Sequence, residues 1–280
     1  MPVSTPAPEP APEPVPATAS APASASASAD HYDRLLAQHY TWMLGGDLAA
    51  LANEQADLLR SLGVAPATAD ATADATAVDL GCGPGNQSLA LAQLGFDRVL
   101  AVDTSTTLLD ELATAAAGNP AIRPVHADLR AALPRITQPG SVAAVVCMGD
   151  TLTHLPAKND VTALLGDITR ALTVGGKLVI TYRDLTRPLT GSDRFILVRG
   201  TADRLLTCFL DYRDDDTVLV HDLVHTRTGD GWTQQVGSYP KLRIGADWLA
   251  AQCATAGLTV ERSEIGPRGM RVLTAVKQHG

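Results

Sequence analysis

The chain has 280 residues and a formal net charge of −8. This acidic balance argues against a nucleic-acid partner, because phosphate binding calls for a basic face. No apolar run approaches the roughly 20 residues that a membrane span needs. The four cysteines are scattered and form no CxxC pair, which disfavours a zinc site or a disulfide framework. We therefore expect a cytoplasmic protein with no bound metal and no membrane segment.

Residues 1–29 consist almost entirely of Pro, Ala, Ser, Thr and Glu. Such a segment cannot bury enough apolar surface to offset the entropy lost on ordering it. It also lacks the basic and apolar regions of a secretory signal. The sequence predicts a disordered tail over residues 1–29, followed by a single domain over residues 30–280.

Two helices are expected between residues 30 and 64. Asp47 can cap the second helix, whose leucines keep a helical period until Gly63 ends it. Residues 65–77 repeat Ala-Thr-Ala-Asp and are typical of a low-complexity linker.

From residue 77 onward, short apolar strands alternate with helices. The expected strands cover residues 78–80, 98–103, 122–128, 142–148 and 177–182. Thr104 or Ser105 can cap the helix that follows the second strand. This alternation indicates an α/β fold with a parallel sheet that helices cover on both faces.

The pattern changes between about residues 190 and 244, where four strand-like runs follow one another with no helix between them. We expect an inserted antiparallel meander there. A helix at 247–256 then precedes two strands, at 258–264 and 270–276. A four-residue link joins these last strands and forces them to run antiparallel.

The glycine-rich loop at residues 81–85 lies between the first strand and the next helix. Glycines allow a sharp turn and a close approach to a ligand, and the helix N-terminus offers unpaired N–H groups. Asp103 ends the second strand, where a carboxylate can accept both hydroxyls of a ribose. These features together predict nucleoside binding. The order G-x-G-x-G disfavours a dinucleotide loop, which reads G-x-G-x-x-G.

Residues 79–85, DLGCGPG, resemble the first motif of class I S-adenosylmethionine-dependent methyltransferases. The resemblance covers residues 77–277 and implies a Rossmann-like seven-stranded sheet with an antiparallel last strand. It also implies S-adenosyl-L-methionine as the cofactor and the chemistry of a transferase. Since the Asn-Pro-Pro-Tyr-type signature is missing at strand four, a small-molecule substrate is favoured over a nucleic acid or a protein.

The resemblance also assigns cofactor-binding positions. They are Tyr32, Asp79, Gly81, Cys82, Gly83, Asp103, Thr104, Asp128, Leu129, Met148 and Gly149. In the family, the glycine loop meets the amino-acid end of the cofactor, Asp103 matches the ribose-binding acid, and Asp128 matches the acid near the adenine amino group. The backbone at Met148 and Gly149 faces the methionine amino group. For Asp128, a helix cap is the alternative interpretation.

The helices of residues 30–64 resemble the cap that many small-molecule methyltransferases fold over the cofactor. They hold Tyr32, His39, Tyr40 and Trp42, although only 4% of the chain is aromatic. Aromatic faces suit the cationic sulfonium. We expect Tyr32 to contact the cofactor, whereas packing within the cap explains Tyr40 and Trp42 equally well.

Four residues at the ends of strands four and five are candidates for catalysis. They are Asp150, His154, Tyr182 and Arg183. His154 can act as a base near neutral pH or make a structural hydrogen bond, and Asp150 can orient an amine or cap the next turn. Tyr182 and Arg183 are expected at the same edge, where Arg183 suits either a substrate carboxylate or a surface ion pair.

The inserted meander carries further polar residues. His221 and His225 would stand roughly 13 Å apart on one strand face, which is too far for a shared metal ion. We expect them on a polar roof over the substrate. Tyr239, Lys241 and Arg243 alternate in the same way and are candidates to meet an acidic substrate.

The function expected from these features is methyl transfer to an oxygen or nitrogen of a small molecule. A second hypothesis is another reaction at the sulfonium, such as ring closure of the cofactor's own chain with release of methylthioadenosine. A third is a binding module that holds the cofactor without catalysis. The sequence permits a homodimer but does not require one.

Overall fold

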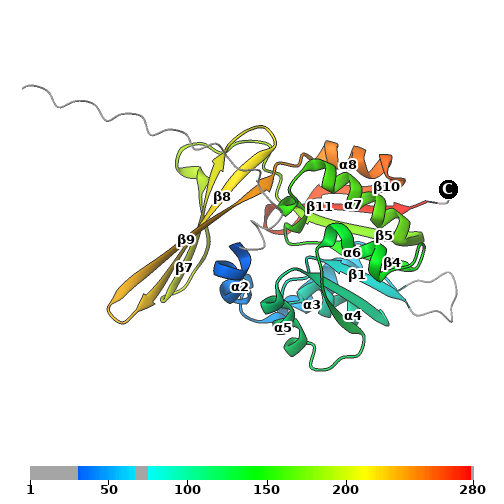
Figure 1. Cartoon of the computed structure of the whole chain (residues 1–280), viewed down its shortest axis with the longest axis horizontal. Helices are drawn as coiled ribbons and strands as arrows, with labels where there is room; N and C mark the ends of the chain where they lie inside the picture. The colour runs from blue at the N-terminus through cyan, green and yellow to red at the C-terminus, as the bar shows by residue number, and fades with distance from the viewer. Residues whose placement is uncertain (1–30, 67–74, 279–280) are drawn as a thin grey trace, which may run out of the picture.

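The computed structural model describes residues 31–66 and 75–278 of the chain. They form a seven-stranded sheet flanked by helices and a separate four-stranded sheet (Figure 1). The predicted tail at residues 1–29 and most of the predicted linker lie outside the described residues. Among the residues described, no helix has the length and the apolar character to span a membrane.

The large sheet has the strand order β10-β11-β5-β4-β1-β2-β3. Its strands are β1 (Thr76–Leu80), β2 (Arg98–Asp103), β3 (Ile122–His126), β4 (Val142–Cys147), β5 (Leu172–Tyr182), β10 (Leu258–Ile265) and β11 (Arg271–Lys277). Strands β1 to β5 pair in parallel, and β11 is antiparallel to both β5 and β10. The expected seven-stranded α/β sheet with an antiparallel last strand is thereby confirmed.

Helices cover both faces of this sheet. They are α3 (Leu48–Ser61), α4 (Asn86–Gln93), α5 (Thr106–Ala115), α6 (Leu129–Ile136), α7 (Lys158–Ala171) and α8 (Ala246–Thr255). One apolar cluster joins α6, α7 and α8 to the sheet, and a second joins α3, α4 and α5 to it. Parallel strands buried on both faces are continuously apolar, as in β4, whose six residues are all buried.

The small sheet is the expected antiparallel meander. Its strands, in spatial order, are β6 (Phe195–Gly200), β7 (Arg204–Tyr212), β8 (Thr217–Thr228) and β9 (Gly231–Leu242). Figure 1 shows it projecting from the helix-covered sheet, with α2 lying between the two. A short 3-10 turn, η3 (Gly191–Arg194), leads into it after β5.

The first described helices pack on the small sheet rather than on the large one. They are η1 (Tyr32–Leu36), a π-helical turn, and α2 (Ala37–Leu44). Leu35 and Leu36 join Leu206, Val220 and Val224 of the small sheet in a third apolar cluster. The predicted cap therefore has two parts, because α3 packs on the large sheet instead.

Side-chain caps fix where several helices begin. Asp47 accepts a hydrogen bond from the backbone N–H of Ala50 at 2.9 Å, as expected for the start of α3. Ser105, rather than Thr104, caps α5. Helices α4, α5, α6 and α7 each begin after the carboxyl end of a strand, so the loops after β1, β2, β3 and β4 meet along one edge of the sheet.

Candidate functional site

A pocket enclosing about 840 Å³, its open mouth included, lies at this edge beneath η1 and α2. The strand order reverses between β1 and β4, which is where ligands bind in open α/β sheets. Many of the predicted cofactor-binding residues line it, namely Tyr32, Gly81, Gly83, Asp103, Thr104, Asp128, Leu129 and Gly149. The structure therefore brings together residues from four strand ends and the cap.

The glycine loop after β1 depends on its glycines. Gly81 and Gly83 have φ angles of +70° and +54°, a region that L side chains rarely adopt. A Cβ at Gly81 would collide with the side chain of Thr151 across the pocket. Gly85, with φ of +97°, is the N-cap of α4, and a Cβ there would collide with Leu112. Bare backbone thus forms this wall of the pocket, which is the cradle that a closely held ligand needs.

Asp103 fastens the glycine loop to the end of β2. Its Oδ2 accepts from the backbone N–H of Gly83 at 2.8 Å, and its Oδ1 accepts from that of Ser105 at 2.9 Å. Each carboxylate oxygen can accept a further hydrogen bond. Because Asp103 also lines the pocket, it can hold the loop and receive the hydroxyls of a ribose at the same time.

Asp128 fits both of its interpretations. It is the N-cap of α6, accepting from the backbone N–H of Arg130 at 2.9 Å, and it also lines the pocket. The Arg130 guanidinium lies 2.5 Å from its Oδ2 and holds the pKa of Asp128 below its ordinary value. The carboxylate is therefore ionised and oriented next to Leu129, where a ring amino group could donate to it.

Three predicted cofactor residues lie behind the pocket wall rather than along it. Asp79 is 1% exposed and accepts from Ser88 Oγ at 2.7 Å, and burial raises its pKa to about 7. Cys82 is buried with its Sγ directed to the carbonyl of Gly83. The Met148 side chain is also buried, whereas the adjacent Gly149 reaches the pocket.

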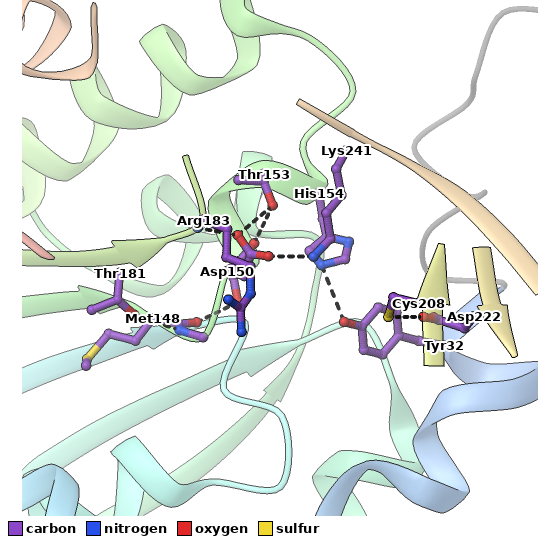
Figure 2. Close-up of polar contacts among 12 residues, drawn as sticks. Tyr32, Met148, Asp150, Thr153, His154, Thr181, Arg183, Cys208, Asp222 and Lys241 are labelled. Atoms are coloured by element: carbon purple, nitrogen blue, oxygen red, sulfur yellow. Dashed lines mark hydrogen bonds and ion pairs between the residues drawn. The ribbon is translucent and has the colours of Figure 1, made fainter. Parts of the chain in front are cut away.

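Aromatic rings close the cap side of the pocket. Tyr32 and Tyr40 both line it, with ring centroids 5.7 Å apart. The Tyr32 hydroxyl lies 3.3 Å from His154 Nε2, and the His154 ring stacks on Tyr239 at 5.2 Å and 15° (Figure 2). We call Tyr32, Tyr40, His154 and Tyr239 the aromatic wall. Tyr40, for which the sequence left core packing equally open, is thus a pocket residue.

His154 is neutral at physiological pH. Burial, followed by the charges of Lys241 and His31, places its pKa well below 6.5. Its Nδ1 is buried and has no hydrogen-bond partner among the described residues. The ring can therefore orient a substrate by hydrogen bonding, but it is a weak base.

Asp150 links three elements beside the aromatic wall. Its Oδ2 lies 2.5 Å from Lys241 Nζ on β9. Its Oδ1 accepts from the backbone N–H of Arg183 at 2.9 Å and from Thr153 Oγ1 at 3.0 Å (Figure 2). Both carboxylate oxygens are thus engaged, and the residue has a φ of +80°. Asp150 does not line the pocket, and its contacts suit positioning of the loop that carries His154.

The other two catalytic candidates also lie off the pocket. Tyr182 is 1% exposed within the apolar cluster of α7 and α8, and burial raises its pKa. Arg183 is exposed, and Figure 2 places it beside Asp150. Successive side chains in an extended segment point to opposite faces, so Tyr182 is buried while the next residue, Arg183, is exposed.

The face of the inserted sheet that packs against η1 and α2 is not the face that carries His221 and His225. Val218, Val220 and Val224 are buried in the cluster formed with η1 and α2, so His221 and His225 belong to the opposite face of β8. The prediction that these histidines form the substrate roof is wrong, because the strand turns its alternate residues toward the cap.

Of the three alternating residues Tyr239, Lys241 and Arg243, the two that lie in β9 reach the surroundings of the site. Tyr239 joins the aromatic wall and Lys241 pairs with Asp150. The guanidinium of Arg243 instead donates to the carbonyls of Leu185 and Thr186, which ties the root of the insertion to the segment after β5. Arg243 is therefore a structural residue.

One buried pair had no signal in the sequence. His31 Nε2 lies 2.9 Å from Asp222 Oδ2, with side-chain exposures of 4% and 2%. Cys208 Sγ lies 2.8 Å from the other oxygen of Asp222, and the His31 ring lies 4.5 Å from that of Tyr239. The pair joins residues 191 positions apart, and only the packing of the cap on the small sheet brings them together.

Part of the chain that forms this site matches a known family model. Residues 77–176 match the family model described as a methyltransferase domain. A search of curated proteins found no significant match.

Several solved structures share the fold. An S-adenosylmethionine-dependent methyltransferase from Clostridium acetobutylicum is 15% identical, with a TM-score of 0.65 over 90% of this chain and 98% of that one. CalS10, an amino pentose methyltransferase from Micromonospora echinaspora with S-adenosylmethionine bound, is 17% identical, with a TM-score of 0.63 over 86% and 96%. The sugar N-methyltransferase KedS8 from a Streptoalloteichus species is 17% identical, with a TM-score of 0.62 over 96% and 99%. At these identities the likeness establishes the fold.

Proposed function

We propose that this protein methylates a nitrogen atom of a small-molecule amine, with S-adenosyl-L-methionine as cofactor. The match of residues 77–176 to the methyltransferase domain model supports this proposal. One observation carries the choice of nitrogen. Among the described residues, the pocket presents no strong base: His154 has a pKa well below 6.5, and Asp150 is occupied by Lys241 and by the backbone of Arg183.

The residues of the pocket fit the cofactor. The positive φ angles of Gly81 and Gly83 turn the backbone of the loop along the pocket, which suits the amino-acid end of the cofactor. Asp103 and Asp128 offer oriented carboxylates for the ribose and for the adenine amino group. The bound cofactor supplies an activated methyl carbon, and the aromatic wall suits its positive charge.

The protein then has mainly to position the nucleophile and exclude water. A hydroxyl acceptor would need a base to take its proton, whereas a neutral amine attacks with its own lone pair. The neutral His154 lines the pocket and can hydrogen-bond the amine, and Tyr32 fixes the ring through Nε2. Lys241 and Asp150 hold the loop in place.

Two structural neighbours lend support. CalS10 is an amino pentose methyltransferase and KedS8 is a sugar N-methyltransferase, and this chain aligns with 96% and 99% of their lengths. An amine borne by a small metabolite such as a sugar is therefore the substrate class to try first.

The test is mass spectrometry of the purified protein incubated with S-adenosylmethionine and a panel of amino sugars and other small amines, each matched to its hydroxyl analogue. We expect products heavier by one methyl group with amines only, together with S-adenosylhomocysteine. An Asp103→Ala variant, which loses the carboxylate of β2, serves as the inactive control.

Three results would contradict the proposal. Methylation of the hydroxyl analogues alone would make the assignment of nitrogen wrong. Methylthioadenosine released without any acceptor would favour chemistry on the cofactor's own chain. Tight cofactor binding with no product across the panel would favour a non-catalytic module.

A further inference from the structure

A cationic cluster lies outside the pocket, where α2 meets β6 and β7. Arg199 of β6 and Arg204 of β7 place their guanidinium carbons 5.6 Å and 5.0 Å from the centre of the Trp42 ring. Gly200 pairs with Leu205 in this antiparallel ladder, so the two arginines are near neighbours across the strands. Together with His39 of α2, these side chains form what we call the Trp42 cluster.

The hydrogen bonds within the Trp42 cluster determine which His39 nitrogen carries the proton. Arg204 Nη1 lies 3.2 Å from His39 Nδ1. A guanidinium can only donate, so Nδ1 accepts and the neutral ring carries its hydrogen on Nε2. His39 is 8% exposed, and its Nε2 has no partner among the described residues.

Two more donors in the cluster lack acceptors. The Nε atoms of Arg199 and Arg204 are buried and have no hydrogen-bond partner within the described chain. With His39 Nε2, three N–H groups of the Trp42 cluster therefore have no acceptor among the described residues. Buried polar groups are nearly always satisfied in native proteins, so this concentration of orphaned donors calls for a partner.

Charge leads to the same conclusion. In the part of the chain that the structure describes, no carboxylate forms an ion pair with Arg199 or Arg204, although the chain carries eight more acidic than basic residues. Stacking on Trp42 stabilises the guanidinium groups but leaves their in-plane N–H groups free to donate. The Nη2 of Arg199 also lies 3.5 Å from the carbonyl of Gly45 at the end of α2.

We propose that the Trp42 cluster binds an oxyanion, the phosphate or carboxylate group of a small molecule. The planar forks of Arg199 and Arg204 match such a group, and His39 Nε2–H adds a third donor. Trp42 and both arginines are partly exposed, so the site is open to solvent. The proposal rests on the junction between cap and small sheet and does not depend on methyl transfer.

The state of His39 offers a readout. Burial and the neighbouring Arg204 lower its pKa below 6.5, so the ring is neutral when the cluster is empty. An anion seated beside the ring would offset the effect of Arg204, so the pKa of His39 would rise on binding.

The experiment follows the His39 ring by NMR in the full-length protein. Inorganic phosphate and acetate are each titrated against chloride at constant ionic strength, and the two probes distinguish a phosphate site from a carboxylate site. We expect saturable shifts of the His39 resonances with one or both probes. Arg199→Gln and Arg204→Gln should each weaken this binding by about tenfold or more. Arg213→Gln is the matched control, since Arg213 is exposed and pairs with Asp211.

The proposal is overturned if neither probe shifts His39 beyond the chloride control in the wild-type protein, a comparison that needs no variant to fold. It is equally overturned if both arginine variants bind the probe as Arg213→Gln does. Binding of S-adenosylmethionine is measured in the same samples and tests the pocket separately. Loss of cofactor binding would count against the proposed methyl transfer and not against the anion site.

Discussion

At the scale of single residues, folding buries the carboxyl group of Asp79, where its ionised form is unfavourable. It is 1% exposed beneath the glycine loop, and burial raises its pKa from 3.8 to about 7. The unfolded chain therefore loses this proton near pH 4, whereas the folded chain keeps it until about pH 7. The wild-type protein should lose stability as the pH rises through this window, by up to about 4 kcal/mol, and the loss should level off above it.

Urea unfolding from pH 4.5 to 7.5 checks this expectation with Asp79→Asn, which keeps an acceptor for Ser88 but cannot ionise. As the pH rises, the wild type should lose stability while the variant does not. The free energy of unfolding of the variant should therefore increase relative to that of the wild type. Asp57→Asn is the control, because the Asp57 side chain is 80% exposed and its effect should hardly vary with pH. A constant difference between wild type and Asp79→Asn would contradict the interpretation.

Among the predicted site residues that line the pocket, several have positions that follow from the local backbone. Gly81, Gly83 and Asp103 follow from a loop between a strand and a helix, where chain geometry leaves little choice. The directions of Asp79 and Tyr182 were not predictable, because each depends on which side of a strand or loop finds room in the core. The position of a residue in the sequence predicts that it lies near the site, but it does not predict whether its side chain points into the site.

At the scale of elements, one ion pair joins the end of β4 to the inserted sheet. Asp150 and Lys241 lie 2.5 Å apart with side-chain exposures of 7% and 11%. Lys241→Met should leave a buried carboxylate unpaired and cost about 3 kcal/mol or more of unfolding free energy. It should also reduce kcat, because the loop that positions His154 loses its anchor.

Thermal or urea unfolding measures the effect, and Lys158→Met provides the comparison. Lys158 likewise reaches the insertion, pairing with Asp216 at 2.5 Å, but the two side chains are 31% and 65% exposed. We expect that change to cost less than about 1 kcal/mol. The double variant Lys241→Met with Asp150→Asn should recover part of the loss. If the two lysine variants proved equally mild, the Asp150 pair would not anchor the loop.

Most elements were predictable, because strands and helices of this fold have different apolar periods and are separated by glycines. The insertion was expected as four strand-like runs with no helix between them, and the structure has four antiparallel strands there. The bounds of helix α6 were not predicted, although the alternative interpretation of Asp128 as a helix cap implied a helix there. It is only eight residues long and contains Pro134, and its start at Asp128 also suited a ligand contact.

At the scale of the whole molecule, the arrangement of the cap was beyond the sequence. The N-terminal helices were expected to act together, but η1 and α2 dock on the small sheet while α3 belongs to the large one. Contacts between residues nearly two hundred positions apart, such as His31 with Asp222, leave no periodic pattern to detect. The pocket is thus built from two bodies, the sheet edge below and the cap with its supporting sheet above.

This division predicts that the cap can loosen without unfolding the cofactor-binding half. Asp222→Ala removes the buried partner of His31 and should speed hydrogen exchange in residues 32–44 by about tenfold or more. Exchange in α4, at the glycine loop, should stay unchanged, because α4 packs on α3 and the large sheet. Asp211→Ala, which removes an exposed partner of Arg213 on β7, should alter neither segment. If hydrogen exchange in α2 and α4 increased equally, the cap and the sheet edge would open as one unit. If faster exchange is confined to the cap, η1 and α2 form the gate through which a substrate reaches the aromatic wall.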